Sequence, residues 1–254
     1  MKTKVFPFKG ILRKILRYLL YLYRPKIFGR TACLGRDLFD LKYKFGKKPL
    51  LINKQKVRVD LHMDWIRGHT RPRADIVKKY ILRDDIHPLI DQQAEYHWDN
   101  RSNIKYFIMD SFSELTDQKF THKEEGWSFC AHHSDINHES DFSEKFQKNG
   151  LLTIQKIEVG YELFFNWFEN SFPGKSLYYF HFPTNLDNRQ VFRDRGAEIL
   201  KIMQGFEHKK SFIKNIFIDE KFSFGDESDP FPYHFHEKTY KLFLAEWNKK
   251  HCCD

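Results

Sequence analysis

The stretch Lys105-Tyr-Phe-Ile-Met-Asp-Ser-Phe-Ser-Glu-Leu-Thr-Asp117 joins an apolar, aromatic-rich run to an abrupt polar end. Residues 104–109 predict a short buried strand, and Asp110-Ser111 follows directly where that strand stops. In open α/β folds, ligands bind at the carboxyl edge of the sheet. Ser111 is therefore a candidate nucleophile, provided that other segments bring a base and an oxyanion donor to the same edge.

Apolar segments of strand and helix character alternate along the rest of the chain. The predicted elements are strands at 176–182 and 212–218 and helices at 150–172, 189–203 and 237–247. Residues 49–61 have β character, whereas the Glu-, His- and Ser-rich residues 121–143 are expected to form a loop. The alternation predicts a single α/β domain over residues 31–254, with a mostly parallel sheet and flanking helices.

The composition describes a folded protein with an excess of positive charge. Of its 254 residues, 41% are hydrophobic and 30% are charged, which is typical of a globular protein rather than a disordered one. The formal net charge of +9 favours an anionic partner: a membrane surface, a nucleotide-bearing cofactor, an acidic glycan or nucleic acid. Cys33, Cys130, Cys252 and Cys253 have neither zinc-site spacing nor the pattern of a disulfide framework, so we expect a reducing compartment.

The first thirty residues form a distinct basic segment of the sequence. Residues 11–23 carry apolar side chains at helical spacing, with Arg13, Lys14 and Arg17 among them. The charges leave too short an apolar run to span a bilayer, and no secretory cleavage site follows it. Two alternatives are open. This helix binds an anionic membrane surface through residues 9–26, or it docks on its own domain.

A second apolar run, Leu177 to Phe182, also leads into polar residues. Asn185 is a candidate oxyanion donor because a side-chain amide at a strand end can face a developing negative charge. Asn188 is an alternative donor. Arg189 is a candidate for binding a phosphate or carboxylate, and its other interpretation is a solvated helix face.

The loop before the last predicted helix brings histidines and carboxylates together. A serine nucleophile needs a base within hydrogen-bond reach and a carboxylate that fixes the imidazole tautomer. His234 and Asp229 supply both from one loop. His236 is the second-choice base, and Asp226 or Glu227 competes with Asp229.

The order Asp110-Ser111, Thr184-Asn185 and Asp229…His234 resembles the SGNH (GDSL-like) hydrolase and acyltransferase superfamily. The similar stretch covers residues 103–247. The resemblance implies a flavodoxin-like sheet and a triad of Ser111, His234 and Asp229. It also implies oxyanion or substrate contacts from residues at the same edge, for which the candidates are Asp110, Asn185, Asn188 and Arg189. The sequence departs from the family pattern in four places. Met109 stands where the family has glycine, and no Gly-x-Asn-Asp motif is present, which leaves Asn185 and Asn188 as alternatives. The Asp–His spacing of the last motif is longer than in the family, and the second-motif glycine has only Gly126 and Gly150 as candidates.

The function that this resemblance implies is serine-dependent O-acyl transfer to a glycan. We expect acetyl-CoA as the acyl donor and a polysaccharide or lipid-linked glycan as the acceptor, as in bacterial capsule or other surface polysaccharide biosynthesis. A carbohydrate or lipid esterase with the same triad is the alternative. Neither a metal nor nucleic acid is expected, and the predicted location is the cytoplasm, including the inner face of the membrane.

Two rival functions use other features of the sequence. His132, His133, Asp135 and His138, close to Cys130, are metal-ligand types that would suit a metal-dependent phosphodiesterase or nuclease, although their spacing matches no strong zinc motif. A non-enzymatic glycan- or membrane-binding module would use aromatic side chains for stacking. Most aromatics here lie in apolar runs such as residues 163–168, which favours a core position for them.

Overall fold

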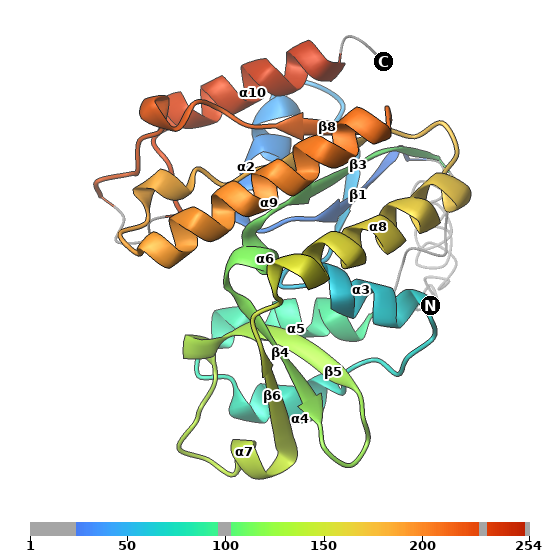
Figure 1. The fold of residues 1–254 in the computed structure, drawn as a ribbon, viewed down its shortest axis with the longest axis vertical. Coiled ribbons are helices and arrows are strands. Elements are labelled where there is room, and N and C mark those ends of the chain that lie inside the picture. The colour runs from blue at the N-terminus through green and yellow to red at the C-terminus, as the bar shows by residue number, and fades with distance from the viewer. Residues whose placement is uncertain (1–23, 96–102, 229–232, 252–254) are drawn as a thin grey trace, which may run out of the picture.

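The computed structural model describes residues 24–95, 103–228 and 233–251, which form two lobes (Figure 1). The larger lobe holds a five-stranded sheet in the order β2-β1-β3-β7-β8, in which every neighbouring pair is parallel. Its strands are β1 (Lys26–Arg30), β2 (Leu50–Asn53), β3 (Ile104–Asp110), β7 (Leu177–Phe180) and β8 (Ile213–Ile216). The predicted α/β class, with a parallel sheet and flanking helices, is confirmed.

Helices cover both faces of this sheet (Figure 1). They are α2 (Cys33–Lys42) and α10 (Glu237–His251) on one face, and α3 (Val59–Ile66), α8 (Ile154–Ser171) and α9 (Gln190–Lys209) on the other. Successive residues of a strand point to opposite faces. The ring of Tyr106 accordingly lies 6.2 Å from that of Trp247 in α10, while the ring of Phe107 lies 4.6 Å from that of Phe168 in α8. Strands with apolar side chains on both faces are typical of parallel sheets.

A buried ion pair sits within this core. The Arg30 guanidinium donates to Glu114 Oε1 at 2.5 Å, to the Val57 carbonyl at 2.6 Å and to the Tyr161 hydroxyl at 2.5 Å. Glu114 belongs to the short helix α6 (Phe112–Thr116) and also accepts the backbone N–H of Val59 at 2.9 Å. Because both charges are shielded from water, each depends on the other and on these hydrogen bonds.

Helix α8 crosses α3 at a glycine. A Cβ placed on Gly160 would lie 2.8 Å from Cγ1 of Val59, so only a hydrogen at this position allows the observed approach. In α9, a Cβ on Gly205 would meet nothing within 4 Å. Gly160 is therefore closely packed and Gly205 is open, although both lie in helices on the same face of the sheet.

The smaller lobe is built on the antiparallel sheet β5-β4-β6, whose strands lie between α6 and α8 in the chain, and on helices from two separate parts of the sequence. Its strands are β4 (Asp117–His122), β5 (Ser128–His132) and β6 (Phe146–Gly150), with helices α4 (Ala74–Val77), α5 (His87–Ala94) and α7 (Phe142–Lys145). It has a hydrophobic cluster of its own, centred on Phe120, Phe129, Phe142 and Phe146. The expectation of a loop over residues 121–143 is wrong, because a β-hairpin occupies its first half.

The N-terminal half differs from expectation in two further places. The sheet begins at Lys26, inside the segment assigned to the basic N-terminal region, and Lys26 itself is buried. The β character expected over residues 49–61 is limited to β2, and α3 begins at Val59. Residues 1–23, which carry the expected amphipathic helix, lie outside the described residues. No helix of the described ranges is long and apolar enough to cross a bilayer.

Candidate active site

The strand order reverses between β1 and β3, since the chain winds outward to β2 on one side and to β7 and β8 on the other. In open α/β sheets, such a reversal leaves a crevice at the carboxyl ends of the strands. Four segments reach this edge: residues 31–33 after β1, residues 54–56 after β2, residues 110–112 after β3, and Tyr233-His234 before α10.

Cys33 and His234 line one cavity at this edge. The cavity has a volume of about 340 Å³, and its wall also includes Arg36, Gln55 and Phe112. A thiol and an imidazole are a nucleophile and a base that proteins combine in covalent catalysis. The sequence predicts His234 as a base, whereas its cysteines, Cys33 among them, indicate only a reducing compartment.

Cys33 is the first residue of α2 and is partly buried. Burial raises the pKa of its thiol, and the nearby carboxylates of Asp37 and Asp110 raise it further. The protonated thiol is therefore the resting form at neutral pH, so attack by the sulfur requires a base.

The backbone that carries Cys33 is held by two side chains, the buried Asp110 and the half-buried Asn53. Asp110 Oδ2 accepts the N–H of Ala32 at 2.7 Å, and its Oδ1 accepts the N–H of Phe112 at 3.2 Å. Asn53 accepts the N–H of Thr31 at 3.1 Å and donates to the Thr31 carbonyl at 2.9 Å. Burial raises the pKa of Asp110 to about 7, although these N–H groups favour its charged form. Asp110 is thus a buried anchor of the segment after β1.

The segment that carries His234 is also fixed. The N–H of Asp226 donates to the His234 carbonyl at 3.1 Å, and the N–H of His236 donates to the Phe224 carbonyl at 2.9 Å. Tyr233 packs its ring 4.9 Å from that of Phe112, in an edge-to-face arrangement. Its hydroxyl donates to Asp187 at 2.8 Å. These contacts hold in place the strand-like segment that carries the imidazole of His234.

A second cavity of about 590 Å³ adjoins the first and shares Lys56, Arg83, Phe112 and Tyr233 with it. We refer to the two joined cavities as the edge groove. One wall belongs to the large lobe, and the other contains His132, Ser134 and Asp135 of the small lobe. The groove thus lies between the two lobes, and a ligand of it would contact both.

Lys56 lines both cavities in an unusual backbone conformation, with φ of 52°. A non-glycine residue in the left-handed region is uncommon and is often found at functional sites. Its ammonium lies 2.9 Å from Asp135 and 3.5 Å from Asp117. Burial opposes the charged form, but the two carboxylates outweigh burial and raise the pKa of Lys56.

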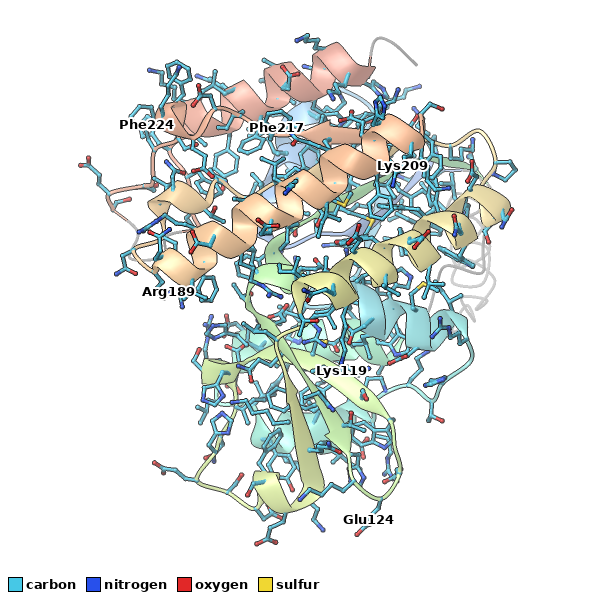
Figure 2. The ribbon with its side chains drawn as sticks, in the orientation of Figure 1. Lys119, Glu124, Arg189, Lys209, Phe217 and Phe224 are labelled. Carbon is cyan, nitrogen blue, oxygen red and sulfur yellow. The ribbon has the colours of Figure 1, made fainter. Side chains whose placement is uncertain are left out.

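Two arginines of the groove are each clamped by an aspartate two positions away. Arg83 donates Nε and Nη2 to Asp85 at 3.1 and 2.5 Å. Arg189 donates the same two nitrogens to Asp187 at 2.9 and 2.7 Å. Arg189 lies at the start of α9, above the small lobe (Figure 2). These hydrogen bonds, together with Tyr233, lower the pKa of Asp187 to about 2.

Ser111 lies at the expected place, immediately after β3, but its side chain is buried. Its residue is 2% exposed, and its hydroxyl oxygen accepts the N–H of Phe182 at 3.0 Å. It does not line either cavity of the edge groove. The structure therefore brings Ser111 to the right edge of the sheet while its hydroxyl is directed into packing between β3 and β7.

The remaining predicted site residues divide between the groove and other places. Asn188 and Arg189 line the larger cavity. Asn185 donates its amide to the Glu220 carbonyl at 2.7 Å and does not line the groove. His236 is exposed, and its Nδ1 accepts the N–H of Lys238 in the first turn of α10. Asp229 lies outside the described residues.

The glycines considered for the second motif both lie in the small lobe. Gly126 is in the β4–β5 turn with φ of 75°, and Gly150 ends β6 with φ of 70°. These positive φ values explain their identity as turn glycines. The segment after β2, which does reach the groove, contains Lys54, Gln55 and Lys56 instead.

The metal-ligand types of the rival function are spread along β5 and the turn after it. Cys130 is buried in β5, where its backbone N–H donates to Gln93. The ring centroids of His133 and His138 lie 4.1 Å apart in a tilted arrangement, and His132 lines the groove. Within the described ranges, these and other His, Cys, Asp and Glu residues form no group of three or more arranged to hold a metal ion.

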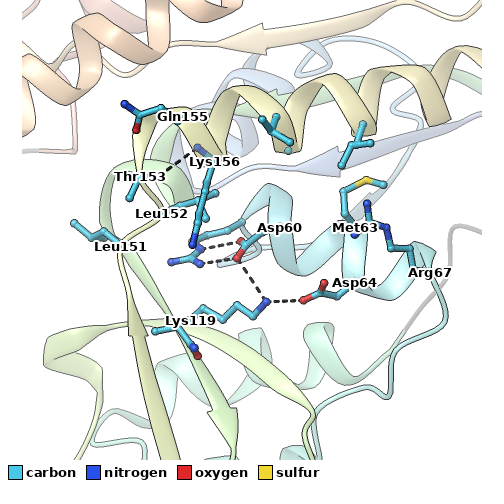
Figure 3. A pocket seen from close by; sticks show the side chains of 15 residues that line it. Asp60, Met63, Asp64, Arg67, Lys119, Leu151, Leu152, Thr153, Gln155 and Lys156 are labelled. Atoms are coloured by element: carbon cyan, nitrogen blue, oxygen red, sulfur yellow. Dashed lines mark hydrogen bonds and ion pairs between the residues drawn. The ribbon is translucent and has the colours of Figure 1, made fainter.

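A third cavity, of about 500 Å³, lies between α3, the start of α8 and β4 (Figure 3). Its floor is a chain of ion pairs, in which Arg58 contacts Asp60 at 2.7 Å and Lys119 contacts Asp64 at 2.5 Å. Lys119 also lies 3.6 Å from Asp60. These pairs join β4 of the small lobe to α3 of the large lobe, so they have a structural role.

The comparisons with known proteins add little to this geometry. No family model matches the chain, and no curated protein is similar to it. One solved structure, described as "a putative platelet activating factor from Streptococcus pneumonia", is similar over 94% of this chain and 98% of its own, with 7% identity and a TM-score of 0.44. Proteins this distantly similar need not share a function.

Cys33 is the main residue that the sequence analysis missed. A short apolar run, Ile27-Phe28, followed within a few residues by a cysteine, is the same strand-then-nucleophile pattern that drew attention to Ser111. The signal was hidden because the basic residues before it placed this run in the N-terminal segment.

Proposed function

We propose that the edge groove catalyses acyl transfer through a thioester on Cys33, with His234 as the general base. The observation that carries this proposal is that Cys33 and His234 line one cavity at the reversal of strand order. Ser111, the nucleophile expected from the sequence, is less suitable because its hydroxyl is buried and accepts a backbone N–H.

The proposed reaction has two balanced steps. In the first, His234 takes the thiol proton while the Cys33 sulfur attacks the acyl carbon, and the donor's leaving group departs with that proton. In the second, an acceptor hydroxyl gives its proton to His234 and attacks the thioester, which breaks the C–S bond and returns the proton to Cys33. If water replaces the acceptor, the same steps hydrolyse an ester.

The negative charge that develops on the acyl oxygen needs a donor in the same cavity. The N-terminus of α2, where Cys33 lies, carries a partial positive charge. The side-chain amide of Gln55 lines the cavity and is a candidate donor. An oxyanion donor of this kind typically contributes about 3 kcal/mol of barrier reduction.

The substrates proposed for this site are an acyl-CoA donor, with acetyl-CoA first, and a hydroxyl of a polysaccharide or lipid-linked glycan. The groove supports this choice through its size and its exposed arginines, because drug-sized and cofactor-sized ligands occupy cavities of roughly 300–1,000 Å³. Contact with an anionic membrane surface through the basic segment 9–26, apart from the buried Lys26, is a separate proposal, tested by liposome binding before and after deletion of residues 1–23.

The decisive experiment is intact-mass spectrometry after incubation with acetyl-CoA, followed by peptide mapping. We expect one added acetyl group on the peptide that contains Cys33, released by neutral hydroxylamine as a thioester is. Cys33→Ala abolishes the adduct, His234→Gln slows its formation, and Ser111→Ala leaves it in place. An adduct that persists in Cys33→Ala but is lost in Ser111→Ala would overturn this assignment in favour of a serine ester.

A further inference from the structure

Three arginines surround the edge groove, and they come from three separate segments. Arg36 is in the first turns of α2, Arg83 precedes the short helix of Asp84–Ile86, and Arg189 precedes α9. Arg36 is exposed and lines the smaller cavity beside Cys33. No Asp or Glu of the described residues lies within ion-pairing distance of its guanidinium, which leaves it available to a ligand.

Arg83 and Arg189 are partly neutralised, but they are oriented. Their side chains are 46% and 47% exposed, and each is fixed through Nε and Nη2 by its aspartate. A guanidinium held along one edge has lost much of its conformational freedom before a ligand arrives. The remaining N–H groups of Arg189 can therefore bind an anion with a smaller entropic penalty. Nη1 of Arg83 lies 3.9 Å from Asp135, so an anion at this arginine competes with that carboxylate.

Lys56 fixes the floor of the groove. Its ammonium is held between two carboxylates that outnumber it, so it adds no net positive charge there, and the anion-binding groups of the groove are the three arginines. The strained backbone at this residue is explained if the side chain must reach the floor of both cavities.

We infer that the edge groove binds a diphosphate-bearing ligand, with Arg36, Arg83 and Arg189 contacting its phosphate oxygens. Planar guanidinium groups bind phosphates through paired hydrogen bonds. The two joined cavities contain three of these groups, which is more than a ligand with a single carboxylate would need. The reaction of the bound ligand rests on the proposed function, whereas its binding by the arginines does not. Two ligands could supply this diphosphate: coenzyme A, or a nucleotide-linked sugar that serves as the acceptor.

The test is isothermal titration calorimetry of the full chain with inorganic pyrophosphate, coenzyme A, uridine diphosphate and glucuronate as separate ligands. We expect at least one diphosphate to bind, and to bind less tightly when the salt concentration rises. Arg36→Gln should weaken that binding roughly tenfold, which is the scale of a lost charge-assisted hydrogen bond. The relative affinities for coenzyme A and uridine diphosphate identify the source.

The matched control is Arg67→Gln, which removes an exposed arginine from the third cavity and should leave binding unchanged. Thermal denaturation of Arg36→Gln should match that of the wild type, since this side chain has no carboxylate partner to lose. Absence of binding by all three diphosphates at about 1 mM, equal weakening by both variants, or binding of glucuronate alone would overturn the inference.

Titration of Cys33→Ala separates this inference from the proposed function. If diphosphate binding is retained in Cys33→Ala and no acyl adduct forms in the wild type, the binding site is supported and the thioester mechanism is rejected. If an adduct forms in the wild type while no diphosphate binds, the mechanism is supported and the diphosphate site is rejected.

Discussion

Asp110 makes folding stability depend on pH in a direction opposite to that of an ion-paired carboxylate such as Asp187, whose pKa is lowered. Its pKa is raised from 3.8 to about 7 by burial, so the folded protein binds this proton more tightly than the unfolded chain does. The contribution of Asp110 to the free energy of unfolding is therefore fully present below pH 3.8 and is lost as pH rises through about 7.

Guanidinium denaturation between pH 5 and pH 8 checks this prediction. We expect the wild type to lose more stability over this range than Asp110→Asn does, because the variant has no proton to lose at this position. Other titrating groups are common to both proteins and cancel in the comparison. Equal pH slopes would show that Asp110 titrates at its ordinary value.

The buried Glu114 predicts a large effect from a small chemical change. Glu114→Gln keeps the shape of the side chain but leaves the Arg30 guanidinium without a counter-charge in the core. Breaking a buried pair in this way typically costs about 3–5 kcal/mol. The measurement is the free energy of unfolding from denaturant titration.

The control for Glu114 is Glu237→Gln, which removes one partner of an exposed pair with Lys241 at 2.8 Å. No measurable change is expected there, because solvent screens exposed pairs. Similar losses in the two variants would mean that the core pair contributes no more than a surface one.

At the scale of elements, the contact between α3 and α8 depends on Gly160. Gly160→Ala would bring a methyl group to 2.8 Å from Val59, so the two helices must separate or Val59 must change rotamer. We expect a loss of about 1–3 kcal/mol in the free energy of unfolding. Thermal or denaturant unfolding measures this loss.

Gly205→Ala is the matched substitution in α9, where the added methyl group meets nothing. Alanine is the better helix former, so this variant should gain up to about 1 kcal/mol. Opposite signs for the two substitutions are the expected result. A loss in both would indicate that the helix position alone, rather than the contact with Val59, decides the outcome.

The elements that were predictable from the sequence are those with continuous apolar runs. Strands β3 and β7 and helix α8 were predicted close to their observed bounds, because burial on both faces or on one stripe leaves a clear pattern. Helix α9 was predicted to end at Met203 but continues to Lys209. Strand β1 was not predicted, since its buried Lys26 and Arg30 look like surface residues in the sequence. In β4, Phe120 is the one apolar residue among six, so the strand resembled a loop.

The candidate site was predictable only where it depended on well-predicted strands. The carboxyl edge of the sheet and the segment of His234 followed from local patterns. The choice between Cys33 and Ser111 did not, because it depends on which strands are neighbours and on which side chain faces the groove. Neither property is encoded locally.

At the scale of the whole molecule, Lys56 ties the two lobes together. Its ammonium contacts Asp117 at the start of β4 and Asp135 after β5, both buried. Lys56→Met would leave Asp117 without its cation and Asp135 with only Arg83, at 3.9 Å. We expect a loss of about 3 kcal/mol in the free energy of unfolding and faster amide hydrogen exchange in β4 and β5 than in β3 or β7.

Lys48→Met is the control for Lys56, because Lys48 pairs with Asp40 at a position where both side chains are nearly half exposed. Its exchange pattern should match that of the wild type. Uniform acceleration across both sheets in Lys56→Met would show that the lobes open together, and that the contact is not specific to the small lobe.

The two sides of the smaller cavity are about 200 positions apart in the chain, with Cys33 on one and His234 on the other. Ribosomes add about 5–20 residues each second, so roughly 10 to 40 seconds separate the emergence of the thiol from that of the imidazole. During this interval the nascent chain carries Cys33 without the imidazole of His234. The cavity gains its His234 side only after the segment before α10 has docked, so under the proposed function an acylation that needs this base cannot begin on the ribosome.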